Sequence, residues 1–299
     1  MLITFNVRGN ERIMEINKVI HKLLESKIIQ SNIKNYKKLS GGTVSELFLI
    51  SCSDGSNLVV KTNDPQIVKS EANFLDYYKE IGFFPKIQYV DESFQYIVYS
   101  YISGSTNYGR NNKKEILLTL VDEVINQYKP VLKPSGWGWA DELFESWKGF
   151  LLNRAIEANE TLTSHLDDAD FYLILDLIKS PNRFSGAPYL IHGDCGVHNF
   201  IFNENHLCGV IDPTPVIGDP LYDLIYAFCS SPDDLSKDHI DSLISNLVIG
   251  ERKNNHTTIY EEVLIGLYLR LGTCLKHHPN DFNEYMKSWN YWKNSILEK

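Results

Sequence analysis

The most informative stretch of the sequence reads Ile191-His192-Gly193-Asp194-Cys195-Gly196-Val197-His198-Asn199-Phe200. Two strand-like runs follow it, 199–203 and 207–212, and Glu204-Asn205-His206 provides a turn between them. A hairpin returns its end to its start, so we expect Asp194, Asn199 and Asp212 to face one cleft. Carboxylate and amide oxygens that converge in this way suit Mg²⁺, which prefers oxygen ligands and phosphates. Asp194 is then left to accept a proton from a hydroxyl.

The order His192-x-Asp194-x-x-x-x-Asn199, followed by Ile211-Asp212, resembles the catalytic loop and metal-binding segment of the aminoglycoside phosphotransferase and choline kinase family. The family members are small-molecule relatives of protein kinases, and the resemblance covers about residues 35–230. It implies an α+β, protein-kinase-like fold of two lobes, a small antiparallel-sheet N-terminal lobe and a larger, mainly helical C-terminal lobe. It also implies a kinase that uses Mg²⁺ and transfers the γ-phosphate of ATP or GTP to a hydroxyl of a small molecule.

Segments further upstream extend the resemblance. Residues 39–45 resemble the loop that covers the nucleotide, and Val59-Val60-Lys61 resembles the strand with the phosphate-binding lysine. The resemblance makes Glu71, on the next helix, the partner that holds this lysine. It places the interlobe hinge at residues 100–102, whose backbone would meet the adenine. The nucleotide-binding residues that it implies are Gly42, Thr43, Ser45, Lys61, Glu71, Ser100 and Ile102.

Carried over to the catalytic segment, the resemblance makes Asp194 the catalytic base and makes Asn199 and Asp212 the ligands of Mg²⁺. It makes His192 an orienting residue that bonds backbone beside the metal site. Cys195 and His198 stand at variable motif positions and receive no catalytic role. Further along, Asp219 before Pro220 is typical of a helix cap, and we expect Asp223 to be a buried carboxylate that ties this helix to the catalytic loop.

Plainer interpretations and other functions stay open at this point. Asp and Asn in loops most often make local bonds to backbone, and a lysine is most often solvated. His192, His198 and the two aspartates 194 and 212 also allow a transition-metal phosphoesterase, which leaves Lys61 and Glu71 unexplained. A silent binding module with the same fold is a third class. The ordered set from Lys61 to Asp212 favours the kinase.

Composition bounds the class of protein. The 299 residues are 43% hydrophobic and 22% charged, which is typical of a globular protein and excludes a disordered or collagen-like chain. The net charge of −9 argues against a nucleic-acid binder. Five scattered cysteines favour a reducing compartment, and neither a signal peptide nor a membrane span is evident. We therefore expect a cytoplasmic protein without nucleic-acid or membrane partners, as a monomer or homodimer.

The spacing of the hydrophobic residues changes near residue 103 and divides the chain into two parts. Strand-like runs dominate residues 1–103, the expected nucleotide-binding lobe, and amphipathic helices dominate residues 104–299, the expected lobe of the catalytic loop, metal site and acceptor pocket. The predicted helices cover residues 11–30, 65–82, 113–129, 142–160, 166–180, 219–230, 257–277 and 281–297.

Charge suggests what the acceptor is. Residues 1–103 carry a net charge of +1 and residues 104–299 carry −10, so we expect a cationic acceptor. An aminoglycoside-type antibiotic, and with it a role in antibiotic resistance, fits best. Choline, an amino sugar or methylthioribose is the alternative. Residues 135–151 are similar to a segment of the hygromycin-phosphotransferase-like branch, and Trp137 or Trp139 would stack on a sugar there or pack in the core.

Overall fold

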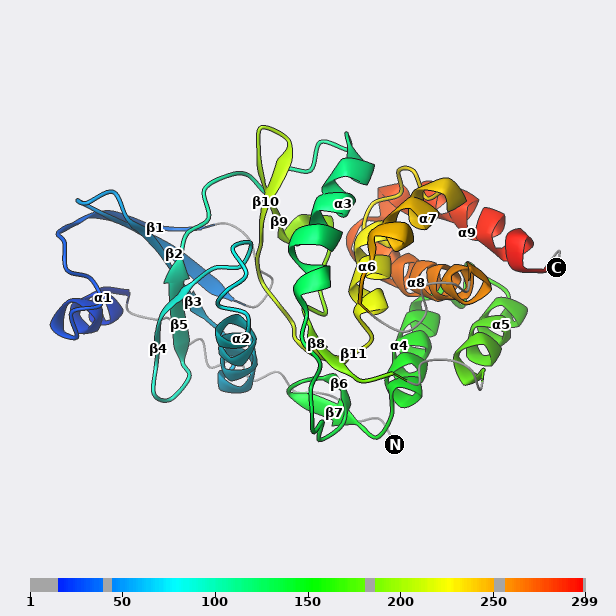
Figure 1. Ribbon diagram of the computed structural model, residues 1–299, viewed down its shortest axis with the longest axis horizontal. Helices are drawn as coiled ribbons and strands as arrows, with labels where there is room; N and C mark the ends of the chain where they lie inside the picture. The colour runs from blue at the N-terminus through cyan, green and yellow to red at the C-terminus, as the bar shows by residue number, and fades with distance from the viewer. Residues whose placement is uncertain (1–15, 40–44, 181–185, 250–255, 298–299) are drawn as a thin grey trace. The chain divides into compact units, whose positions relative to one another are not determined.

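The computed structural model describes residues 16–39, 45–180, 186–249 and 256–297. Their contacts divide the chain into two compact units. The first unit consists of Met1–Val68 and Ile87–Tyr101, and the second consists of Lys69–Lys86 and Ile102–Lys299. The chain therefore passes between the units three times, and neither unit is one continuous segment. Figure 1 shows the order of the elements along the chain.

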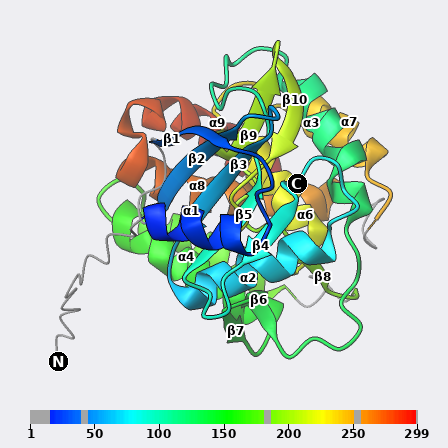
Figure 2. The same ribbon diagram turned by 90° about the vertical axis from the view of Figure 1, so that its left-hand side faces the viewer.

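The first unit is built on an antiparallel sheet of five strands in the order β1-β2-β3-β5-β4. Helix α1 lies across this sheet (Figure 2). Val19 and Leu23 of α1 pack against Ile50, Val60 and Val98, so the apolar face of the helix covers the sheet's core. The bounds of its elements are α1 (Ile16–Glu25), β1 (Ile33–Lys38), β2 (Glu46–Cys52), β3 (Asn57–Thr62), β4 (Ile87–Val90) and β5 (Tyr96–Ser100).

Helix α2 (Pro65–Tyr77) begins in the first unit and ends in the second. The Asp64 carboxylate accepts a hydrogen bond from the Gln66 amide at 2.9 Å, and Pro65 occupies the first turn, as its fixed φ allows. The later residues of this segment belong to the core of the second unit: Phe74 and Phe84 pack on the His192 ring, and the Tyr78 hydroxyl donates to the Leu190 carbonyl.

Helices form most of the second unit. Helix α8 lies at its centre and contacts α4, α5, α6 and α9, while α3 packs on α7 (Figure 1). Helix α9 contributes Trp289 and Trp292, both essentially without exposed surface. The bounds are α3 (Lys113–Glu123), α4 (Trp147–Leu162), α5 (Asp168–Lys179), α6 (Pro220–Cys229), α7 (Lys237–Asn246), α8 (His256–His277) and α9 (Phe282–Leu297), with 3₁₀ turns η1 (Ile125–Gln127), η2 (Val197–Asn199) and η3 (Pro279–Asp281).

Two small sheets complete the second unit. The hairpin β9 (Phe200–Asn203) and β10 (His206–Val210) turns at Glu204 and Asn205, which have φ angles of 48° and 68°. The other sheet has the order β7-β6-β11-β8 and joins β6 (Trp137–Trp139), β7 (Glu142–Phe144), β8 (Tyr189–Ile191) and β11 (Val216–Gly218). The predicted start of a helix at residue 142 is wrong, because 142–144 pair with β6 and the helix begins at Trp147, capped by Ser146.

No helix in the described part of the chain is both long enough and apolar enough to cross a membrane.

Candidate active site

Helix α6 anchors the loop that carries the His192–Asn199 motif. The Asp223 carboxylate of α6 has no exposed surface and accepts hydrogen bonds from the amides of His192 at 2.7 Å and Gly193 at 2.9 Å. The Tyr128 hydroxyl donates to the same carboxylate at 2.8 Å. Burial raises the pKa of Asp223 to about 7, while these donors oppose that shift. The prediction that Asp223 ties its helix to this loop is confirmed.

His192 orients the loop from inside the core. Its Nε2 lies 3.0 Å from the Ile211 carbonyl, and because a carbonyl only accepts, Nε2 carries the proton. The Thr214 amide donates to the His192 carbonyl at 3.0 Å, which joins the two segments of the site a second time. Burial lowers the pKa of His192 to about 4, so the ring is neutral. The predicted bond from His192 to backbone is therefore confirmed.

Gly193 is required where the two segments approach each other. Its φ is 81°, and a Cβ at this position would lie 1.9 Å from the Thr214 carbonyl oxygen. No other residue combines that conformation with that space. The glycine lets the loop turn sharply and present the next side chain, Asp194, away from the core.

Asp194 is held by three donors. The Tyr226 hydroxyl of α6 donates to Oδ1, the Asn199 amide nitrogen lies 3.0 Å from Oδ2, and His198 Nε2 lies 3.2 Å from Oδ2. Burial opposes ionisation, but the bonds from His198 and Tyr226 lower the pKa of Asp194 below its ordinary value. Asp194 is therefore a fixed, ionised carboxylate that can accept a proton at neutral pH.

The donor set at Asn199 and Asp212 suits a hard cation. Asn199 Nδ2 donates to both the backbone carbonyl and the carboxylate of Asp194, which fixes the amide and leaves Oδ1 without a donor among the described residues. The Ile211 amide donates to the Asn199 carbonyl at 2.9 Å, so the next residue, Asp212, follows directly from the loop. Asp212 has a φ of 60°, a left-handed conformation that Asp tolerates better than most residues. An amide oxygen and a carboxylate are oxygen ligands of the kind that Mg²⁺ takes.

Three of the predicted nucleotide-binding residues lie in the first unit. Lys61 is the penultimate residue of β3, paired with Leu47 and Ile97, and is 2% exposed. The Ser45 hydroxyl, just before β2, accepts from the Asn63 amide at 2.9 Å, and Ser100 ends β5 opposite Leu58. Gly42 and Thr43 lie outside the described residues.

Glu71 and Ile102 belong to the second unit. Glu71 is on α2 and is 1% exposed. The Ile102 side chain packs against Gly209 of β10, where an added Cβ would lie 2.8 Å from Ile102 Cδ1. The pairing of Lys61 with Glu71 and the convergence of Lys61 on Asp194 stay predictions, since these residues lie in separate units.

Sequence reasoning missed two partners of Asp194, His198 and Tyr226. His198 was given no role, and Tyr226 was not considered. A signal for Tyr226 was available: it stands three positions after Asp223 on α6, so both side chains lie on the helix face toward the loop. Trp137 and Trp139 lie on β6. The Trp139 ring packs edge-on against the Phe150 ring, with 5.3 Å between the ring centres.

The phosphoesterase alternative requires several His, Cys, Asp or Glu side chains around one metal ion. Among the described residues, no group of three or more such side chains could hold a metal ion. His192 is one of the four residues named for the phosphoesterase alternative, and its Nε2 is bonded to the Ile211 carbonyl.

Comparison with known proteins assigns the chain to a family. Residues 35–252, more than two thirds of the sequence, match the model of the phosphotransferase enzyme family. The chain belongs to this family. The phosphotransferase matches no curated protein sequence. The matched range includes every residue from Lys61 to Asp212.

Solved structures agree with this fold. An aminoglycoside phosphotransferase APH(4)-Ia in ternary complex with AMP-PNP and hygromycin B is 18% identical, with a TM-score of 0.61 over 93% of this chain and 98% of that one. A putative fructosamine-3-kinase from Haemophilus somnus 129PT is 19% identical, with a TM-score of 0.62 over 93% and 96%. An aminoglycoside 2'-phosphotransferase in complex with GDP is 16% identical, with a TM-score of 0.58 over 94% and 98%.

At these identities the similarity concerns the fold. The predicted α+β class, with an antiparallel sheet in the N-terminal region and helices in the C-terminal region, is confirmed. The acceptor of the phosphotransferase is a separate question, since the similar structures include aminoglycoside and putative fructosamine kinases.

Proposed function

We propose that the phosphotransferase transfers the γ-phosphoryl group of ATP or GTP to a hydroxyl of a small-molecule acceptor, with Asp194 as the base. The observation that carries this proposal is the environment of Asp194, a carboxylate with a lowered pKa, held by Tyr226, His198 and Asn199. The acceptor oxygen forms a bond to the γ-phosphorus, the bond to the nucleoside diphosphate breaks, and the hydroxyl proton passes to Asp194.

The other residues bind and orient. Asn199 Oδ1 and the Asp212 carboxylate would hold Mg²⁺, which when bound neutralises charge on the nucleotide's phosphates. We assign Lys61 to the α- and β-phosphates, Glu71 to the orientation of that lysine, and residues 42–45 and 100–102 to the rest of the nucleotide. The resemblance described above supports these assignments, and all of these residues lie in the range 35–252 that matches the family model.

For the acceptor we propose an amine-bearing molecule, because residues 104–299 carry a net charge of −10. An aminoglycoside-type antibiotic is the first class and would make antibiotic resistance the physiological role. A smaller amine-bearing metabolite, such as choline or an amino sugar, is the second class. We further propose that the enzyme acts in the cytoplasm as a monomer or homodimer.

A nucleotide-consumption screen tests the function. Aminoglycosides, hygromycin B, choline, amino sugars and methylthioribose are each incubated with the enzyme, Mg²⁺ and either ATP or GTP. We expect acceptor-dependent release of nucleoside diphosphate and a phosphorylated product by mass spectrometry. Asp194→Ala should lower kcat by a factor of about 10² to 10⁴ and leave nucleotide affinity nearly unchanged, since the base does not hold the nucleotide. Turnover by Asp194→Ala at the wild-type rate would remove Asp194 as the base.

A further inference from the structure

The Asp194 carboxylate has one lone-pair position left for a ligand. An ionised carboxylate offers about four such positions, two on each oxygen. Asn199 Nδ2 and His198 Nε2 both contact Oδ2, at 3.0 Å and 3.2 Å, while the Tyr226 hydroxyl donates to Oδ1. A carboxylate only accepts, so the His198 nitrogen carries a proton in this contact. Oδ2 is therefore fully occupied, and one position on Oδ1 remains for the hydroxyl of an acceptor.

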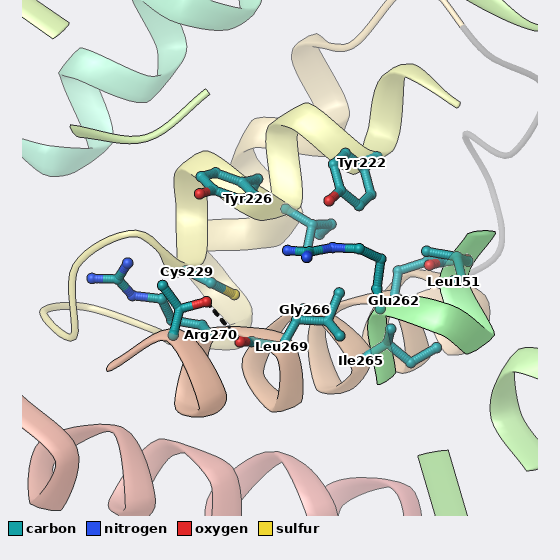
Figure 3. Close-up of a pocket in the computed structure, with 12 residues that line it drawn as sticks. Leu151, Tyr222, Tyr226, Cys229, Glu262, Ile265, Gly266, Leu269 and Arg270 are labelled. Carbon is teal, nitrogen blue, oxygen red and sulfur yellow. Dashed lines mark hydrogen bonds between the residues drawn. The ribbon is translucent and has the colours of Figure 1, made fainter. Parts of the chain in front are cut away.

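His198 is the one exposed residue among these three donors. Asn199 is 5% exposed, and its amide also donates to the Asp194 carbonyl. Tyr226 extends from α6 and packs among residues of α6 and α8 (Figure 3). The His198 side chain is instead 47% exposed, and the Asp194 side chain beside it is 30% exposed. An acceptor that reaches Asp194 therefore meets the imidazole ring as well.

Gly196 provides the space for this ring. A Cβ at position 196 would lie 2.7 Å from His198 Cε1 and 2.8 Å from its Nδ1, closer than side chains come to one another. The backbone of Gly196 is extended, with φ −109° and ψ 162°, a conformation that any residue adopts. The glycine is therefore needed for the position of the ring and not for the conformation of the loop. Gly196 and His198 act as a pair that places the imidazole against Oδ2.

The turn that carries His198 is fixed without the help of its side chain. In η2, the Val197 amide donates to the Ser230 hydroxyl at 3.1 Å, and the Asn199 amide donates to the Gly196 carbonyl at 2.9 Å. Among the described residues the imidazole forms one hydrogen bond, the one to the carboxylate of the proposed base. Removal of the ring should therefore uncover Oδ2 and leave the loop in place.

We propose that His198 determines which hydroxyl of the acceptor is phosphorylated. Because the ring covers Oδ2, a hydroxyl approaches the base only at the remaining position on Oδ1, and the exposed part of the ring contacts the rest of the acceptor. The proposal rests on the proposed function and adds a specificity-determining residue to it. In the transfer, the hydroxyl proton passes to Oδ1 while the acceptor oxygen bonds to the γ-phosphorus and the bond to the nucleoside diphosphate breaks.

Product analysis of acceptors with several hydroxyls tests the proposal. Hygromycin B, kanamycin and glucosamine are each incubated with the enzyme, Mg²⁺ and ATP or GTP, and ³¹P NMR gives the position of the phosphate in the product. The wild type should form one main regioisomer. His198→Ala opens a second position, on Oδ2, so the share of the other regioisomers should rise by about fivefold, the effect of one hydrogen bond. KM for the nucleotide should stay at the wild-type value.

Further variants separate the position of the ring from its presence. Gly196→Ala keeps the imidazole but displaces it, so it should change the products in the same way. In the double variant the added Cβ occupies the space that the ring has left, so its products should equal those of His198→Ala. His198→Gln carries an amide donor that can reach Oδ2 and should keep the wild-type product. His206→Ala is the matched control, because His206 is exposed on β10 and bonds to the Glu204 carbonyl.

The reaction with water tests the role of His198 without an acceptor. Water bound to Asp194 attacks the γ-phosphorus, one of its protons passes to the carboxylate, and phosphate and nucleoside diphosphate are released. The wild-type carboxylate offers water the free position on Oδ1, and His198→Ala adds one on Oδ2. We expect acceptor-independent hydrolysis of ATP or GTP to rise by about threefold in His198→Ala and Gly196→Ala. It should stay unchanged in His198→Gln and His206→Ala.

The possible failures are distinct. The same product ratio in wild type, His198→Ala and Gly196→Ala overturns the role of His198 and leaves the kinase function intact. If none of the three probes is phosphorylated, the water reaction decides, and an unchanged rate of hydrolysis in His198→Ala overturns that role. If the wild type consumes nucleotide neither with an acceptor nor with water, the proposed function is wrong, and the role of His198 falls with it.

Discussion

Tyr226 gives Asp194, the proposed base, a partner on helix α6, outside the loop motif. Its hydroxyl donates to Asp194 Oδ1, while Asn199 Nδ2 and His198 Nε2 contact Oδ2. Each oxygen of the carboxylate therefore has a donor, which limits rotation of the side chain. A base fixed in this way is oriented before the acceptor arrives.

Replacement of Tyr226 should move the pH profile. Because the Tyr226 bond lowers the pKa of Asp194, Tyr226→Phe raises that pKa, and the acidic limb of kcat/KM should shift to higher pH. We also expect kcat to fall by about tenfold from the loss of orientation. Tyr222→Phe is the control, as Tyr222 makes no bond to Asp194, and its acidic limb should stay at the wild-type position. Coincident profiles for wild type and Tyr226→Phe would argue against this role.

His192 should make the free energy of unfolding depend on pH. Its pKa falls from 6.5 to about 4 on folding, so between these values the unfolded chain binds more protons and stability rises with pH. Between about pH 7 and pH 4 the wild type should lose about 3 kcal/mol more than His192→Gln, whose amide keeps a donor but does not titrate. Urea unfolding of the two proteins in EDTA measures this difference. Parallel pH dependences would exclude His192 as the cause.

Among the elements, α4 and α8 approach closely at a single glycine. A Cβ on Gly272 of α8 would meet the Cα and Cβ of Ala158 at 2.9 Å, so a larger residue must push the two helices apart. Gly272 and Ala158 therefore set how closely α4 and α8 pack.

Gly272→Val should lower the free energy of unfolding by more than about 2 kcal/mol, because overpacking in a dense core forces backbone shifts. Gly82→Ala is the control: its Cβ would meet nothing within 4 Å, and its φ is not positive, so we expect a change within about 0.5 kcal/mol. Chemical denaturation compares the two variants. If Gly272→Val and Gly82→Ala had the same free energy of unfolding, α4 and α8 would be able to move apart with little loss of stability.

Local signals predicted the longer elements well. Asp64 with Pro65 and Asp219 with Pro220 mark helix starts that the structure has, and Asp219 accepts from the Leu221 amide at 3.0 Å. The sheet β7-β6-β11-β8 was not predicted, because three-residue strands show no alternation and their partners are distant in sequence. Helix α7 was missed as well.

The residues of the candidate site likewise divide into those that the sequence predicted and those that it did not. Asp194, Asn199 and the bond from His192 follow from motif spacing, since a short loop and hairpin fix them locally. Tyr226, Arg154 and Arg270 come from three helices, and only tertiary packing decides that they surround one space. The overall charge of the C-terminal part predicted a cationic acceptor, but a sum of charges does not say which side chains meet in space.

For the whole molecule, nucleotide binding should appear as added stability. With Mg²⁺ and ATP or GTP at one hundred times its dissociation constant, the free energy of unfolding should rise by about 2.7 kcal/mol, and EDTA should abolish most of the gain. Asp212→Asn should abolish it too. Asn tolerates the left-handed conformation at this position, so the nucleotide-free stability of the variant should stay near that of wild type. Thermal shifts measured with each nucleotide would also rank ATP against GTP, and an Asp212→Asn protein stabilised as strongly as wild type would contradict the metal assignment.

The segment 69–86 has a consequence for attempts to divide the protein. Although it precedes β4 and β5 in the chain, it supplies Phe74 and Phe84 against the His192 ring and the Tyr78 hydroxyl to Leu190. A fragment begun at residue 104 would leave the His192 ring, which orients the loop of Asp194, exposed on one side to water. The helical part of this enzyme is thus not a portable module, and recombination or gene fusion within residues 69–103 would separate the loop from its own support.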